Sequence, residues 1–323
     1  MIPKLIAIRA EGVRGLGQID ITLPAAARTA DPLVLTGPCA SGKTRVLEAI
    51  IAAKEACGGY GVHPSPTDWF TNPDAGSIEL TWERAGEATS RGPLTSRWEP
   101  GAPKSSQSTD GALKLALRSF DTSPASWKLE YLHATRHLDV GPAASSPDDQ
   151  PTGYTRIGHG SDKYGFVRPH LERSGLAAGI ATATTLEERG LVLSTQADDP
   201  LGGFAKVLAL LTDKLRWTGV RMRGDRPACM FARKTRTSHD SIELRELSHA
   251  ERMIVLYAAT IDALGLARSL VLLDTPELCL HPEDQIRLIE GLRVAVAEGQ
   301  LIVATTSPAI LRSVASCQVV VLR

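Results

Sequence analysis

An eight-residue segment near the N-terminus has the residue types and spacing of a phosphate-binding loop. Residues 37–44 match the pattern GxxxxGK followed by Ser or Thr at every required position. In that pattern the glycines let backbone N–H groups surround phosphate oxygens, the lysine meets the β- and γ-phosphate charge, and the hydroxyl binds Mg²⁺. The residues expected to contact a bound nucleotide are Gly37, Pro38, Cys39, Ala40, Ser41, Gly42, Lys43, Thr44 and Arg45.

The elements on either side of this segment are those that such a loop requires. Residues 32–36 are nearly all apolar, as expected for a central parallel strand buried on both faces. From residue 43 to residue 57 apolar side chains recur at helical spacing, and two glycines follow as a stop signal. The order of strand, loop and helix favours a phosphate site over a chance glycine turn.

A second apolar strand ends in a carboxylate. Residues 270–273 are Leu-Val-Leu-Leu, and Asp274 follows directly. In a protein with a phosphate-binding loop, an aspartate at this place holds Mg²⁺ through water or through the loop hydroxyl. A buried strand can also end in aspartate at an ordinary turn, but the pairing with residues 37–44 favours the metal role. We therefore predict Thr44 and Asp274 as the Mg²⁺ residues.

Regular and irregular stretches divide the chain into four predicted parts. Strand and helix patterns alternate towards the C-terminus, which predicts an α/β fold with a mostly parallel sheet. Short alternating runs between tryptophans and prolines predict an inserted antiparallel β-subdomain, and a Pro, Ser and Gly-rich stretch over 141–162 predicts a long loop. The parts are 1–61 with the phosphate loop, 62–125 as the β-subdomain, 126–202 as a strand with a long loop or insertion, and 203–323 with the C-terminal motifs.

The composition limits the partners and the compartment. The 36 basic and 36 acidic residues balance, so contact with nucleic acid or an anionic membrane requires a local patch. The best basic runs are 221–226 and 233–236, for which an ordinary exposed hairpin is a slightly better explanation than a binding patch. The five scattered cysteines, the short N-terminal apolar stretch and the lack of an apolar run of about 18 residues favour a cytoplasmic protein without a membrane segment.

The order of these motifs resembles the ABC-type ATPase heads of the RecF, SMC/Rad50 and OLD-like group, a short class of AAA-type ATP-binding proteins. The resemblance covers residues 1–57 and 203–323, and most of the middle is unmatched. It rests on an opening strand with an arginine turn, a tract before a family arginine, a signature motif, a Walker B extension and a switch segment. These segments are, in chain order, Ile6–Ile8 with Val13–Leu16, Tyr131–Arg136, Leu247–Arg252, Asp274–Pro282 and Ala304–Pro308.

The resemblance implies a P-loop NTPase fold of ABC-ATPase type that binds ATP and Mg²⁺ between two subunits. Ser248, Ala250 and Glu251 would then face the γ-phosphate held by a second copy or a related head. Ser-x-x-Glu before an apolar helix is also a capping box, and both roles are compatible. Ala250 stands where the group usually has glycine, which restricts backbone approach but keeps the Ser248 hydroxyl.

Two further departures concern hydrolysis. Thr275 stands where the group has a glutamate that positions the attacking water, and Thr306 stands where it has a histidine. A threonine hydroxyl cannot act as a general base at neutral pH, so hydrolysis should be weak. Glu277 and His281 are near, but they match family positions that look structural.

The implied function is a nucleotide-dependent dimerisation switch. By analogy with the group, it would act in DNA repair or antiphage defence with DNA or a separate effector, such as a nuclease, as candidate partners. The chain ends after its last strand, so the nuclease domain of OLD-like proteins is expected to be absent. A fully active DNA-stimulated ATPase and a non-hydrolysing scaffold remain alternatives, whereas the opening strand disfavours a transporter subunit.

Overall fold

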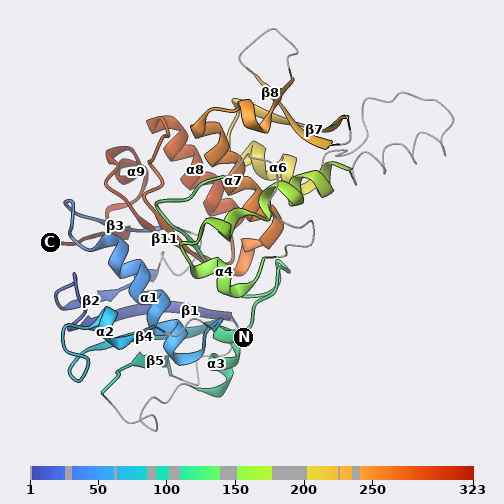
Figure 1. Ribbon diagram of the computed structural model, residues 1–323. Helices are drawn as coiled ribbons and strands as arrows, with labels where there is room; N and C mark the ends of the chain where they lie inside the picture. The colour runs from blue at the N-terminus through green and yellow to red at the C-terminus, as the bar shows by residue number, and fades with distance from the viewer. Residues whose placement is uncertain are drawn as a thin grey trace. The chain divides into compact units, whose positions relative to one another are not determined.

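The computed structural model describes residues 2–25, 31–61, 64–85, 92–101, 110–138, 151–176, 202–224, 226–234 and 241–323. The chain divides into two compact units (Figure 1). Unit 1 comprises Met1–Thr135, Thr152–His159 and Gly265–Arg323, and unit 2 comprises Arg136–Pro151 and Gly160–Leu264. No helix among the described residues is both long and apolar enough to cross a membrane.

Unit 1 contains a five-stranded sheet in which every neighbouring pair is parallel. Its strands, in spatial order, are β12 (Val319–Val321), β3 (Leu33–Thr36), β11 (Gln300–Ala304), β10 (Leu270–Asp274) and β6 (Leu129–Leu132). Every residue of β10 and β11 is buried, which explains their nearly continuous apolar sequence. The mostly parallel sheet predicted from the alternation of strands and helices is confirmed.

A second sheet of unit 1 is antiparallel. Its strands, in spatial order, are β2 (Ile19–Thr22), β1 (Ile2–Glu11), β4 (Ser77–Ala85) and β5 (Leu94–Trp98). The strands expected within 62–125 are therefore present, and they extend the sheet that begins at the N-terminus. Trp82 of β4 is fully buried and donates a hydrogen bond from its ring N–H to Ser96 Oγ over 2.8 Å.

Helix α1 (Lys43–Gly58) packs against strands of both sheets, namely β10 and β11 of the parallel sheet and β4 and β5 of the antiparallel one (Figure 1). Its buried residues therefore surround the helix instead of forming one stripe, and they include Leu47, Ile50 and Ala53. Lys54 and Glu55 are buried as well and form an ion pair at 2.8 Å. Because α1 is held on several sides, its N-terminus is a rigid base for the preceding loop.

The other helices of unit 1 are shorter or lie near the C-terminus. They are α2 (Pro66–Trp69), α3 (Gly111–Arg118), α4 (Gly153–Ile157), α8 (Pro282–Ala295) and α9 (Pro308–Ser313), with 3₁₀ turns at Leu266–Arg268 and Ser316–Gln318. Helix α4 lies inside the stretch predicted as one long loop, so that prediction was wrong at 153–157. Residues 141–150 of the same stretch lie outside the described residues.

Unit 2 contains a three-stranded antiparallel sheet of β7 (Leu215–Arg223), β8 (Arg226–Arg233) and β9 (Ser241–Glu243). Helix α6 (Gly202–Leu211) packs against α7 (His249–Leu264), and a further helix spans 167–176. A 3₁₀ turn at Leu244–Glu246 joins β9 to α7, and another spans Ser161–Tyr164. Helix α6 ends at Leu211, and Leu215 pairs with Arg233 at the start of β7.

Candidate functional site

The loop between β3 and α1 requires glycine at positions 37 and 42 for steric reasons. A Cβ at Gly37 would lie 2.4 Å from the carbonyl oxygen of Leu322, and one at Gly42 would lie 2.5 Å from Leu16 Cδ2. Gly42 also has a φ of 85°, which disfavours residues with a side chain. Because the cap of α1 is a glycine, its N-terminal N–H groups have no side-chain cap and face the loop. This arrangement suits an anion at the helix N-terminus.

Lys43 lies folded over the loop that precedes it. Its Nζ donates to the carbonyl oxygens of Gly37, over 2.9 Å, and Pro38, over 2.8 Å, and lies 3.4 Å from Ser41 Oγ. Backbone carbonyl oxygens of the loop thus hold the Lys43 ammonium group next to the loop. Its position agrees with the role of countering phosphate charge.

Thr44 and Asp274 lie in direct contact, although 230 residues separate them. Thr44 Oγ1 donates a hydrogen bond to Asp274 Oδ2 over 2.9 Å, from the first turn of α1 to the end of β10. Asp274 is buried, with 2% of its surface exposed. A hydroxyl beside a carboxylate is an oxygen donor set that Mg²⁺ accepts when water and phosphate complete its shell. The residues present therefore fit the metal, although no cluster of three or more His, Cys, Asp or Glu exists among the described residues.

Thr275 holds an unusual backbone conformation at the end of β10. Its φ is 49°, a region that β-branched residues rarely adopt. Its N–H donates to the carbonyl oxygen of Ala304 over 2.8 Å, and its hydroxyl donates to Asp274 Oδ1 over 3.0 Å. Such conformations persist where surrounding contacts impose them, often at functional sites. The hydroxyl of Thr275 is thereby directed at the carboxylate that accepts from Thr44.

The carboxylate of Glu277 joins the segment after β10 to the segment after β11, which were predicted as a Walker B extension and a switch segment. Thr306 donates to Glu277 Oε1 twice, from its N–H over 2.8 Å and from its hydroxyl over 3.0 Å. The hydroxyl of Thr305 donates to Glu277 Oε2 over 2.7 Å. Thr305 is itself anchored to β3, because its N–H donates to the carbonyl oxygen of Leu35. The sequence analysis did not predict this connection. The available signal was that Glu277 and the two threonines each follow shortly after a buried strand.

Arg45, expected at the nucleotide, instead contacts the segment around α2. Its guanidinium lies 3.7 Å from the centre of the Trp69 ring and donates to the carbonyl oxygen of Asp68 over 3.0 Å. Its Nε donates to the carbonyl oxygen of Arg14, and it pairs with Glu48 at 3.3 Å. In this structure the side chain therefore braces the start of α1 against neighbouring loops.

The signature residues lie in unit 2, at the start of α7, and form a reciprocal capping box. The Ser248 N–H donates to Glu251 Oε2 over 2.7 Å, and the Glu251 N–H donates to Ser248 Oγ over 3.3 Å. Arg233 of β8 binds both oxygens of Glu251, at 2.7 and 2.9 Å. These hydrogen bonds, with Arg233 as the main cause, lower the pKa of Glu251 to about 2. Ser248 is exposed and Ala250 is half-buried.

Two solved SMC head structures match the chain over nearly its full length. The SMC head bound to the C-terminal winged-helix domain of ScpA aligns with a TM-score of 0.55 and 12% identity, over 96% of this chain and 92% of that one. The chain has the fold of an SMC head. The second match is an SMC head domain with an extended coiled coil, bound to the C-terminal domain of ScpA derived from Pyrococcus furiosus. It aligns with a TM-score of 0.51 and 11% identity, over 97% of this chain and 92% of that one.

The SMC-head fold confirms the predicted P-loop fold of ABC-ATPase type. Identities of this size establish the fold alone. No protein-family model matches the sequence, and no curated protein is significantly similar to it. The roles of individual residues must therefore be argued from the geometry of this chain.

Proposed function

We propose that this protein binds ATP and Mg²⁺ in unit 1. The observation that carries the proposal is the hydrogen bond from Thr44 to Asp274 beside a loop in which Gly37 and Gly42 leave no room for a side chain. Backbone N–H groups of residues 37–44 and the Lys43 ammonium would hold the phosphates, while Thr44 and Asp274 would hold Mg²⁺. The oxygen donors, the cation and the helix N-terminus meet at one edge of the parallel sheet, as MgATP requires.

The bound nucleotide acts, in this proposal, as a bridge between two copies of the chain. The phosphate loop belongs to unit 1 and the signature residues belong to unit 2. Ser248 is exposed at the N-terminus of a 16-residue helix, where the helix dipole favours a negative group. The Ser248 hydroxyl and neighbouring N–H groups would receive the γ-phosphate held by Lys43 of the partner copy. Binding would thus favour a closed dimer.

Hydrolysis is expected to be slow. Thr275 offers a hydroxyl instead of a general base, and the carboxylate of Glu277 is engaged by the switch threonines. A P-loop site can still turn over slowly through positioning and electrostatics alone. The nucleotide would then set the lifetime of the dimer instead of driving rapid cycles.

The proposed role is the nucleotide-gated placement of a partner. One of the matched SMC heads is bound to the C-terminal winged-helix domain of ScpA, so a head of this fold can carry a protein partner. We extend this to a separate effector, such as a nuclease, in DNA repair or antiphage defence. The five scattered free cysteines support a cytoplasmic site of action.

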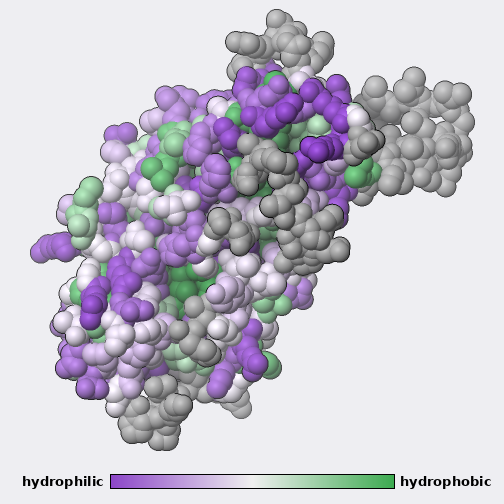
Figure 2. All heavy atoms as spheres, viewed as in Figure 1, coloured by the Kyte–Doolittle hydropathy of each residue, from purple (hydrophilic) through white to green (hydrophobic). Residues whose placement is uncertain are grey.

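A DNA-stimulated ATPase is the second candidate function, and the hairpin of β7 and β8 favours it. Its described residues include Arg216, Arg221 and Arg226, which are all exposed. Figure 2 shows hydrophilic residues gathered over these strands. Exposed arginines on a hairpin suit phosphate backbones, and their neutralisation would make binding salt-dependent.

An equilibrium titration with ATP and Mg²⁺, run beside phosphate release, tests the proposal. The expected result is saturable binding with slow turnover, and Lys43→Ala should weaken binding by about tenfold or more because a charge-assisted contact is lost. Arg312→Ala, which removes a cation in the last turn of α9, is the matched control. Rapid phosphate release that Lys43→Ala abolishes would favour the ATPase, and the absence of saturable binding would refute the proposed function.

A further inference from the structure

Unit 2 contains a pocket of about 380 Å³ whose walls carry four arginines. They come from different elements, because Arg168 lies on the helix over 167–176, Arg223 on β7, Arg226 on β8 and Arg245 on the turn after β9. One glutamate and four apolar or small residues complete the lining. The pocket is thus strongly cationic and formed by this unit alone.

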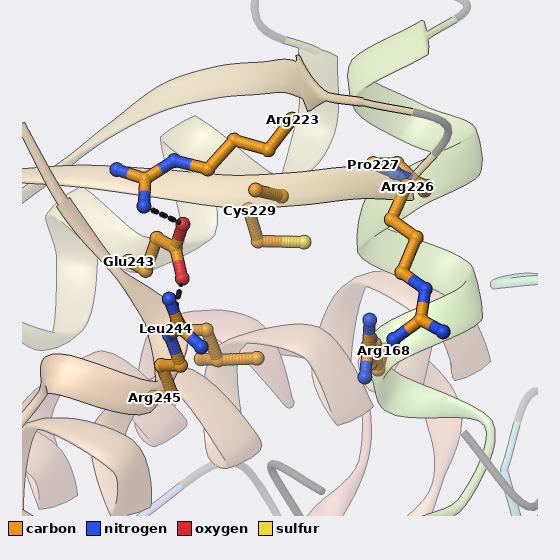
Figure 3. Close-up of a pocket in the computed structure, with 9 residues that line it drawn as sticks. Arg168, Arg223, Arg226, Pro227, Cys229, Glu243, Leu244 and Arg245 are labelled. Atoms are coloured by element: carbon orange, nitrogen blue, oxygen red, sulfur yellow. Dashed lines mark ion pairs between the residues drawn. The ribbon is translucent and has the colours of Figure 1, made fainter. Parts of the chain in front are cut away.

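One side of the pocket is largely neutralised by Glu243. This carboxylate pairs with Arg223 at 2.7 Å and with Arg245 at 2.6 Å (Figure 3). Glu243 is buried, while the two arginines are exposed. Two cations share one anion here, so this side retains a single positive charge.

The opposite side brings two guanidinium groups together. Figure 3 shows the groups of Arg226 and Arg168 next to each other, on the side away from Glu243. Glu172, one turn along the same helix, accepts a hydrogen bond from Arg168 Nε over 2.8 Å and thereby orients that guanidinium. Among the described residues, no carboxylate lies within ion-pair distance of Arg226. Neighbouring guanidinium groups repel each other, and an anion bound between them would remove that repulsion.

The remaining lining restricts the chemistry of the occupant. Burial, with a smaller effect of Glu172, raises the pKa of the Cys229 thiol to about 12. The thiol is therefore neutral near pH 7 and serves neither as a nucleophile nor as a ready metal ligand. Pro227 and Leu244 form an apolar part of the pocket wall. The pocket volume lies within the range of about 300 to 1,000 Å³ that small-molecule sites occupy.

We propose that this pocket binds the phosphate group of a small phosphorylated ligand. The planar guanidinium of Arg226 offers parallel N–H groups that match two phosphate oxygens, and Arg168 would complete the contact. The arginines converge on one pocket from four elements, which favours a compact anion over an extended nucleic-acid strand. This site is distinct from the nucleotide site proposed in unit 1.

Inorganic pyrophosphate is a suitable probe, titrated calorimetrically into the full-length Lys43→Ala chain. That background weakens the loop in unit 1, so heat from unit 2 can be measured separately. The expected result is one site per chain. Arg226→Ser should weaken it by about 10- to 100-fold, the effect of losing a charge-assisted contact, and Arg226→Lys by less, since charge remains but the fork is lost.

Arg216→Ser is the matched control, because Arg216 is an exposed arginine of β7 outside the pocket. It should leave pyrophosphate affinity unchanged. The proposal fails if the Lys43→Ala chain binds no pyrophosphate or if both serine variants weaken it equally. It also fails if a single-stranded DNA oligonucleotide displaces pyrophosphate and depends equally on Arg216 and Arg226, which would identify a nucleic-acid surface. ATP binding by the unmodified chain is independent of these outcomes, so the two proposals can fail separately.

Discussion

Thr306 donates two hydrogen bonds to the same oxygen of Glu277, one from its backbone N–H and one from its hydroxyl. Since Thr305 binds the other oxygen, this carboxylate fastens the segment after β11 to the segment after β10. Thr306, at the position where the resemblance to ABC-type heads predicts a histidine, is therefore tied to the segment after β10. We therefore expect the Glu277 carboxylate to stabilise the geometry of the two segments instead of abstracting a proton from water.

Replacing Glu277 by alanine should destabilise the protein. The substitution removes the acceptor of three hydrogen bonds, and the buried hydroxyl of Thr305 loses the acceptor of its proton. We expect the free energy of unfolding to fall by about 1 to 3 kcal/mol, measured by urea denaturation. Glu290→Ala, at an exposed position of α8, should change it by less than about 0.5 kcal/mol. Equal effects of the two substitutions would contradict the structural role of Glu277.

Restoring both hydrolysis residues should raise the rate of phosphate release. The double variant Thr275→Glu and Thr306→His supplies a carboxylate and an imidazole where the ABC-type resemblance places them. A positioned general base typically contributes about 10² to 10⁴-fold, so a gain of about 10²-fold is expected. Thr275→Gln with Thr306→His, which has the same shape without the base, is the control. If the two double variants release phosphate at the same rate, the degenerate-site account is wrong.

The glycine at the start of the loop should tolerate no side chain. Gly37→Ala places a Cβ 2.4 Å from the carbonyl oxygen of Leu322, so the loop or β12 must move. We expect loss of ATP affinity of about tenfold or more in an equilibrium titration, because the backbone cradle is displaced. Gly17→Ala is the control, since a Cβ there meets no atom within 4 Å. Unchanged affinity in Gly37→Ala would show that phosphates do not depend on this loop.

The pair of Arg233 and Glu251 should contribute stability that depends on pH. Arg233 lowers the pKa of Glu251 to about 2 from a reference of 4.5, so the carboxylate stays ionised to a lower pH in the folded state than in the unfolded state. The contribution is therefore full above pH 4.5 and is lost as the pH falls towards 2. The difference in unfolding free energy between the unmodified protein and Arg233→Gln should shrink over this window. A difference that is the same at about pH 6 and about pH 3 would contradict the pairing.

The local parts of the site were predictable, because each depends on a short stretch of sequence. The loop at 37–44 has its strand and helix beside it in the chain, and the periodicity of both elements is plain. Thr44 and Asp274 lie far apart in the sequence, but their contact was predicted because an aspartate after a buried strand accompanies such a phosphate-binding loop. The capping box at Ser248 was equally local. In each case the residues that act together are adjacent or belong to one recurrent motif.

The connections that escaped prediction depend on tertiary register. Glu277 meets Thr306 because β10 and β11 pair in parallel with Asp274 opposite Ala304, so both chains leave the sheet at the same edge. No periodicity in either segment encodes that register. The strands within 62–125 were likewise visible, but the pairing of β4 with β1 was not, since the two strands lie far apart in the sequence. The arginine pocket forms because the helix over 167–176 brings Arg168 to the hairpin of β7 and β8. The composition of the chain could not indicate this packing.

The mass of the protein in solution with and without MgATP tests the central claim most directly. Measured by sedimentation, the unmodified chain should be a monomer without nucleotide and a dimer with it. Lys43→Ala should stay monomeric because it binds nucleotide weakly, whereas Ser248→Arg should bind ATP and still stay monomeric, because it blocks the partner's γ-phosphate. The account would be contradicted if the mass of the unmodified chain were the same with and without MgATP. It would also be contradicted if the Ser248→Arg chain dimerised as well as the unmodified protein.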